Sequence, residues 1–137
     1  MANTAPIYPK GPHVEWGTTV ITAANTAKDG TGTTNLIFTA DAANGSYVEK
    51  IIFKPAGTNI QTVARLFLNN GGSPATPANN ILIKEYTLPA TTLSETTSQQ
   101  EYEFALNMPI PAGYELMVVL GTAVAAGYYV SIFGGDY

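Results

Sequence analysis

Short β-type segments broken by turn residues run through almost the whole chain, and they constrain its fold more than any other feature. Segments rich in Val, Ile, Phe, Tyr and Thr recur at short intervals, and turn residues gather between them, as in Lys28-Asp29-Gly30 and Asn44-Gly45. No stretch shows the 3.6-residue apolar repeat of an amphipathic helix. This spacing is typical of antiparallel sandwiches, barrels and jelly rolls. The predicted strands are 16–23, 35–40, 47–54, 60–68, 81–88, 101–106, 114–120 and 128–133.

We therefore expect an all-β fold, an antiparallel, jelly-roll-like β-sandwich of about eight strands. A chain of 137 residues suffices for one such domain, which we place at residues 15–137. Residues 1–14 carry Pro6, Pro9 and Pro12 at every third position. Because proline fixes φ and has no N–H to donate, we predict an extended, polyproline-like N-terminal arm that does not join a central strand.

The alternation of apolar and polar residues along each predicted strand indicates which side chains face the core. In 47–54 either face could point to the core, because Ile51 and Phe53 lie on one face and Ile52 on the other. The segment 116–120 is apolar on both faces, so we expect it to be central and covered, or to form part of a subunit contact. The residues predicted to point inward are Leu36, Phe38, Ile51, Phe53, Leu66, Leu68, Phe104, Leu106, Val118, Leu120, Val130 and Ile132.

Composition argues against several classes of protein. Charged residues make up 12 % of the chain, roughly half the fraction usual for soluble domains. With six Lys and Arg and a net charge of -4, we expect no nucleic-acid partner. Because residues 1–6 have no basic region followed by an apolar run, we expect no secretory signal. The uncharged stretch 116–135 contains two β-type runs separated by glycines, so we predict a hairpin there and no membrane span.

The chain offers few residues for catalysis. It has no cysteine and a single histidine, His13, within the predicted arm, so a thiolate or two-histidine metal site is not possible. Glu101 and Glu103 share one face of a predicted strand, roughly 6.5–7 Å apart, and an enzyme relying on this pair is one alternative interpretation. No second signal accompanies the pair. We expect the protein not to be an enzyme, and we expect no cofactor and no metal.

Two features suggest contacts with partners. The linkers 69–80 and 89–100 are long and almost uncharged, and loops of this length are often functional. Aromatic residues and the prolines of the arm are typical interface anchors. The candidate interface residues are Pro6, Tyr8, Pro9, Pro12, Trp16, Met117, Val119, Tyr129 and Tyr137.

Several segments stand out when the sequence is taken as a whole. They are Met1-Ala2-Asn3-Thr4-Ala5-Pro6-Ile7-Tyr8-Pro9, the stretch 22–34 around Ala27-Lys28-Asp29-Gly30-Thr31-Gly32, Leu88-Pro89-Ala90-Thr91-Thr92-Leu93-Ser94-Glu95, Pro111-Ala112-Gly113-Tyr114, Ala125-Ala126-Gly127-Tyr128 and Phe133-Gly134-Gly135-Asp136-Tyr137. Together they resemble a group of small phage and prophage proteins associated with the virion. In general build the chain is similar to phage capsid cement, or decoration, proteins. That family has no catalytic residues to transfer to this sequence.

The resemblance implies a virion structural protein that is made in the host cytoplasm and lies on the capsid surface. Its partners are then the major capsid protein and its own copies, and a homotrimer is the expected state. The alternative is a carbohydrate- or receptor-binding β-sandwich on a tail or fibre, in which exposed Trp16 or Tyr129 stacks on sugar rings.

Overall fold

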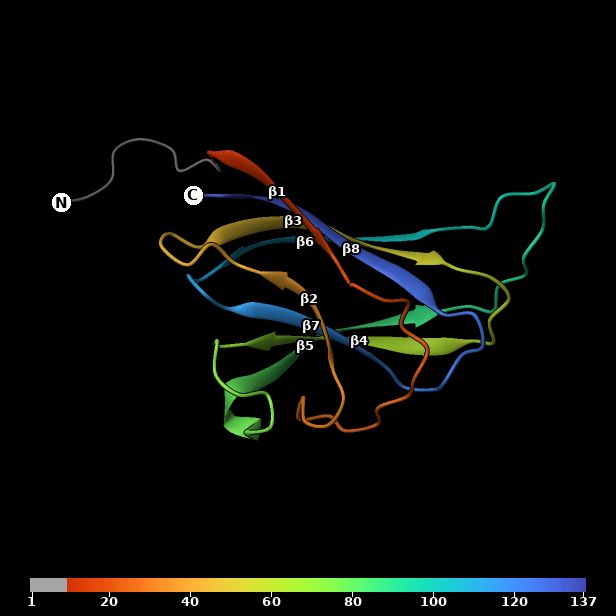
Figure 1. The fold of residues 1–137 in the computed structure, drawn as a ribbon, viewed down its shortest axis with the longest axis horizontal. Helices are drawn as coiled ribbons and strands as arrows, with labels where there is room; N and C mark the ends of the chain where they lie inside the picture. The colour runs from red at the N-terminus through yellow and green to blue at the C-terminus, as the bar shows by residue number, and fades with distance from the viewer. Residues whose placement is uncertain (1–9) are drawn as a thin grey trace.

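A computed structural model describes residues 10–137, which form two four-stranded antiparallel sheets. Sheet A has the strand order β1-β8-β3-β6 and sheet B the order β2-β7-β4-β5. In Figure 1 sheet A lies in the upper half of the molecule and sheet B in the lower half. The strands are β1 (Gly11–Trp16), β2 (Asn35–Thr39), β3 (Ser46–Pro55), β4 (Thr62–Asn69), β5 (Asn80–Leu88), β6 (Tyr102–Ile110), β7 (Glu115–Leu120) and β8 (Tyr128–Asp136), and a 3-10 turn, η1, spans Pro77–Asn79.

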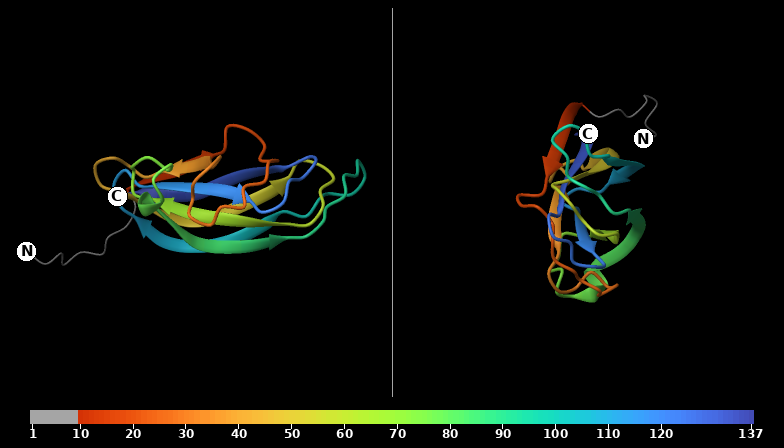
Figure 2. Two further views of the ribbon diagram at one scale, coloured as in Figure 1. Left: turned by 90° about the horizontal axis from the view of Figure 1, so that it is seen from below. Right: turned by 90° about the vertical axis from the view of Figure 1, so that its right-hand side faces the viewer.

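The connectivity is that of a jelly roll, as the sequence predicts. β4 pairs with β5, β3 with β6, β2 with β7 and β1 with β8, all antiparallel. The chain is therefore a long hairpin whose two arms are rolled together, with the pairs alternating between the two sheets. The connection between β5 and β6 projects past the ends of the strands, at the right of Figure 1 and in the left view of Figure 2.

The core lies between the sheets and is built from the inward faces of the alternating strands. Most of the residues predicted to point inward are buried there, and Leu68 and Phe104 pack against the core while partly exposed. Each fully buried large apolar side chain contributes about 1.5–3 kcal/mol relative to exposure. In β3, where the sequence left either face possible, Ile51 and Phe53 point to the core. The largest members include Tyr128, Phe38, Phe53, Ile37, Ile51, Leu66, Leu88, Ile110, Leu116 and Leu120.

β7 is apolar on both faces because both faces are covered by the chain itself. Leu116, Val118 and Leu120 face the core, whereas Met117 and Val119 pack with Phe67 on the outer side of sheet B. The connection of residues 17–34 covers this outer cluster, and it appears in red to orange in front of sheet B in Figure 1.

Three hydrogen bonds hold residues 17–34 over sheet B. The Asn25 N–H donates to the Leu120 carbonyl (2.8 Å), and the Thr34 hydroxyl lies 3.4 Å from the sulfur of Met117. At the far side of the sheet, Asn80 Nδ2 donates to the Asp29 carbonyl (3.1 Å).

One strand prediction and the predicted boundary of the arm differ from the structure near the N-terminus. Residues 17–23, expected in a strand with Trp16, form a connection whose ladder contacts are limited to an isolated bridge from Ile21 to Tyr128. Residues 11–14, expected in the arm, belong to β1, so the sandwich begins before the predicted boundary at residue 15. Pro12 is accommodated because β1 is an edge strand, as the argument from its missing N–H requires.

Backbone irregularities explain two further differences. A register shift between Leu36 and Phe38 turns both Ile37 and Phe38 inward, and Leu36, predicted in the core, is 48 % exposed. β6 continues to Ile110 through Asn107, which adopts a positive φ of 47° that asparagine tolerates, rather than ending at the predicted residue 106.

Candidate interaction surface

The outer face of sheet A carries three exposed apolar side chains, Val14, Trp16 and Tyr129, beside the partly buried Phe133, and we call these four residues the outer aromatic face. Trp16 is 67 % exposed, Tyr129 58 % and Val14 41 %. Strand alternation places them there, because Glu15 and Val130, the neighbours of these residues along β1 and β8, point inward. Val14 lies directly opposite Phe133 in the ladder.

Trp16 stands between two shallow hollows. One, of about 260 Å³, is lined by Trp16, residues 17–20 and Tyr129. The other, of about 310 Å³, is lined by Val14, Glu15, Trp16 and Thr18. An exposed indole flanked by two hollows offers a partner both a flat ring and recesses beside it.

Charged side chains share this face. Lys54 of β3 lies opposite Tyr129 in the ladder, and its ammonium donates to the Gln99 carbonyl (2.9 Å). The ammonium of Lys50 lies 3.2 Å from a carboxylate oxygen of Glu103 and 5.6 Å from the centre of the Phe133 ring. Glu103, one of the two carboxylates considered for catalysis, is therefore in an ion pair. Glu101 precedes β6 and is exposed.

A polar cluster closes the side of the sandwich where β1 faces β2. His13 Nδ1 lies 2.6 Å from Asp136 Oδ1, and Nε2 lies 2.8 Å from Glu15 Oε1. The ring packs against Phe38, with 4.4 Å between the ring centres. The second oxygen of Glu15 accepts the Thr39 N–H of β2 (2.8 Å). The cluster thus ties β1 to β8 in its own sheet and to β2 in the other.

The two carboxylates set the charge state of the histidine. Partial burial lowers the pKa of His13, but the hydrogen bonds with Glu15 and Asp136 and their negative charges outweigh it, and the pKa lies above 6.5. Burial raises the pKa of Asp136, whereas hydrogen bonds from Ser46 and His13 and the charge of His13 lower it below 3.8 overall.

The same cluster contains a serine, but not in a nucleophilic arrangement. The Ser46 hydroxyl donates to Asp136 Oδ1 (2.5 Å) and accepts the Asp41 N–H (2.9 Å). A nucleophilic serine donates its proton to a base, usually a histidine, and here the hydroxyl is directed at the carboxylate instead. We interpret the cluster as a structural tie.

The structure separates the predicted interface residues. Pro12, Trp16 and Tyr129 are exposed on sheet A, and Pro6, Tyr8 and Pro9 lie outside the described residues. Met117 and Val119 were expected at an interface, but they are 2 % and 1 % exposed, so this prediction is wrong. Their outward face is covered by the chain's own residues 17–34 rather than by a partner.

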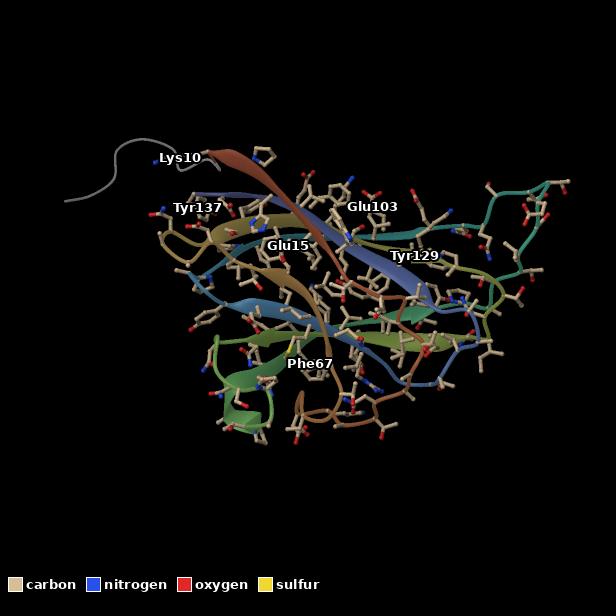
Figure 3. The ribbon with its side chains drawn as sticks, viewed as in Figure 1. Lys10, Glu15, Phe67, Glu103, Tyr129 and Tyr137 are labelled. Carbon is tan, nitrogen blue, oxygen red and sulfur yellow. The ribbon has the colours of Figure 1, made fainter. Side chains whose placement is uncertain are left out.

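The tyrosines near the C-terminus do not form one platform. Tyr128 is fully buried, and Figure 3 shows Tyr129 and Tyr137 at opposite ends of sheet A. Tyr137 is half-buried and its N–H donates to the Gly45 carbonyl (3.2 Å). Of the two, Tyr129 belongs to the outer aromatic face.

Sequence reasoning missed the polar cluster and a second buried residue, Asn59. The spacing of His13 and Glu15 places them on one face of a strand, which is a visible signal once that strand is recognised. Asp136 comes from the other end of the chain, so only the topology brings it there. Asn59 is 3 % exposed and joins two connections at one end of the sandwich, with no sequence signal.

Within residues 10–137, no group of three His, Asp or Glu side chains is arranged to hold a metal ion. No helix in that part of the chain has the length and apolar character required to cross a membrane. Comparisons with protein-family models, with curated proteins and with solved structures find no match. The fold and surface define an eight-stranded jelly-roll sandwich with an exposed aromatic face on one sheet.

Proposed function

We propose that the chain is a phage virion structural protein, a capsid cement (decoration) protein that binds and stabilises the major capsid shell through protein–protein packing. It is made in the host cytoplasm and acts on the capsid surface. Its partners are the major capsid protein and further copies of itself, with three copies as the proposed unit.

The observation that carries this proposal is the outer aromatic face. Trp and Tyr are enriched at the energetic centres of protein interfaces, where charged residues are depleted. Trp16 and Tyr129 are more than half exposed on a regular sheet surface. Of the neighbouring charges, Lys50 and Glu103 are paired with each other, and Lys54 donates to the Gln99 carbonyl. Such a surface favours a protein that works by packing.

The architecture supports the same proposal. Jelly rolls of two four-stranded sheets occur in viral capsid and lectin domains. Because one fold serves many functions, the argument rests on the surface, and the fold adds only compatibility.

The test is binding to capsid shells from the phage that carries the gene. We expect the wild-type protein to co-sediment with purified shells and a Trp16→Ala, Tyr129→Ala double variant to lose that binding. Leu93→Ala is the matched control, because Leu93 is 53 % exposed in the connection between β5 and β6. Absence of the chain from purified particles, with no binding of the wild-type protein to shells, would refute the proposal. Sedimentation equilibrium measures the number of copies.

A second candidate function is glycan binding by a tail or fibre module, and the hollow between Trp16 and Tyr129 favours it. Aromatic rings beside a recess are the surfaces on which sugar rings stack. A glycan array probed with the wild-type protein and with Trp16→Ala separates the two functions. Specific binding lost in the variant supports the glycan module, whereas an array without signal rejects it.

A further inference from the structure

Within residues 10–137, one edge of β1 has no neighbouring strand, because β1 is the last strand of sheet A and β8 is its one strand neighbour there. The Gly17 N–H donates to the Val130 carbonyl (3.0 Å), and Trp16 lies opposite Ser131. Bonded and non-bonded pairs alternate in an antiparallel ladder. The N–H and C=O groups of Val14 and Trp16 therefore point away from β8, toward the open edge.

The other three sheet edges carry features that oppose pairing with another chain. β6 contains Pro109, which donates no ladder bond. β5 presents Lys84 and Glu85, both exposed. β2 has five residues, is bulged, and its Thr39 N–H is taken by Glu15. Charges, prolines and bulges are the usual protection of sheet edges.

β1 carries one such feature, Pro12, at an open-edge position, but it has neither a proline nor an outward-pointing charge at Val14 and Trp16, where its side chains are most apolar. Its two ionisable side chains, His13 and Glu15, point inward, and Glu15 is held by His13 and by the Thr39 N–H. Val14 and Trp16, at the free backbone positions, are 41 % and 67 % exposed. An exposed apolar edge strand without charge is a template for a further strand.

We propose that β1 pairs antiparallel with β1 of a second copy, about a two-fold axis at Val14. This inference rests on the proposed function, which includes contacts between copies of the chain, and it describes one of those contacts. In this register each Val14 N–H donates to the Val14 carbonyl of the second copy. Each Trp16 N–H donates to the Pro12 carbonyl of the second copy.

In this register the side chains are self-complementary, and the backbone bonds form at Val14 and at the Trp16 N–H, whereas the Trp16 carbonyl faces the proline nitrogen and gains no bond. Pro12 is the position whose missing N–H would otherwise face the second copy, and its carbonyl remains available. Trp16 of one copy lies across from Pro12 of the other on the outer face, so the indole covers the pyrrolidine ring while Val14 meets Val14. In a trimeric protein this contact joins neighbouring trimers, because an isologous pairing links copies two at a time.

The absence of cysteine from the chain allows a direct test on the full-length protein. A Val14→Cys variant has a single thiol, which in the paired state lies beside its symmetry mate, with about 5.5 Å between Cα atoms. A short bismaleimide is expected to cross-link most of this variant into dimers. Leu93→Cys, at a remote and somewhat more exposed position (53 % against 41 % for Val14), is the control and is expected to remain uncross-linked.

A second variant breaks the pairing without disturbing the fold. Val14→Pro removes an N–H that β8 does not use, and prolines are tolerated at such edge positions. We expect unchanged circular dichroism and a sedimenting mass about half that of the wild-type protein. A Val14→Cys thiol that reacts fully without cross-linking, or a Val14→Pro variant of wild-type mass, overturns the proposal.

The cross-linking test and the capsid-binding test can fail independently of each other. If Val14→Cys cross-links in solution but the protein does not bind shells, the cement function is rejected and the pairing of β1 stands. If the protein binds shells but Val14→Cys does not cross-link, the pairing is rejected and the cement function stands.

Discussion

Replacing Asn59 with alanine is expected to lower the free energy of unfolding by about 2–3 kcal/mol. The Asn59 side chain is buried where the connections after β3 and β7 meet. Its Oδ1 accepts the N–H groups of Ala126 (2.9 Å) and Gly127 (2.8 Å), and its Nδ2 donates to the carbonyls of Gly127 (3.0 Å) and Gly57 (3.3 Å).

The magnitude depends on which of these groups lose their partner. The Gly57 carbonyl still accepts from Thr91 and Gln99, both at 2.8 Å, and the Gly127 carbonyl still accepts the Ala56 N–H (2.9 Å). The N–H groups of residues 126 and 127 keep no hydrogen bond to the described chain. A buried donor left unsatisfied costs about 1–3 kcal/mol, and residue 126, being partly exposed, falls at the low end.

Urea denaturation followed by circular dichroism measures the loss as a lower midpoint at unchanged m-value. In a thermal scan the same loss corresponds to a fall in Tm of roughly 10 °C for a chain of this size. Gln61→Ala, two residues away and exposed, is the control and is expected to stay within about 0.5 kcal/mol of wild type. A change below about 1 kcal/mol for Asn59→Ala would refute the reasoning.

Three further predictions concern the fold and its polar cluster. Gly134→Ala should destabilise the protein by more than about 1 kcal/mol, because a Cβ there collides with the Tyr47 carbonyl, whereas Gly11→Ala, which meets nothing within 4 Å, should be neutral. Met117→Ala should cost about 2–5 kcal/mol in urea denaturation, as expected for a covered core residue, and a loss under about 1 kcal/mol would mean that the side chain is accessible. The raised pKa of His13 means that its stabilising contribution is complete below pH 6.5 and is lost as the pH rises through the folded-state value. Unfolding free energies measured across this range should therefore fall in the wild-type protein and fall less in His13→Gln, and identical slopes would contradict the assignment.

The strands and their order could be predicted largely from local patterns. Turn residues and period-two alternation mark most of the segments, and eight such segments indicate a jelly-roll-like sandwich. Bulges are less visible, because a register shift depends on the facing strand. Leu36 is the example, since its exposure follows from the irregular pairing of β2 with β7 rather than from its own sequence.

The candidate site could be predicted only in part. Trp16 and Tyr129 were expected at an interface from residue type, and both are exposed on sheet A. Met117 and Val119 were misassigned because an apolar outward face looks the same whether a partner or the chain's own loop covers it. The covering loop, residues 17–34, was itself partly predicted as a strand, so its position over sheet B was not foreseen.

The pairing of β1 with β8 also determines how the molecule responds to mechanical load. The Lys10 N–H donates to the Asp136 carbonyl, so the start of β1 and the end of β8 lie side by side. Tension applied at Lys10 and Tyr137 therefore acts across the strands and opens their hydrogen bonds one pair at a time. His13, with its bonds to Asp136 and Glu15, is the first strong resistance along that path. A molecule pulled at Lys10 and Tyr137 should therefore lose the β1–β8 hydrogen bonds in sequence, at low force. A molecule held through the outer face of sheet A should instead distribute the force over all the bonds between β1 and β8.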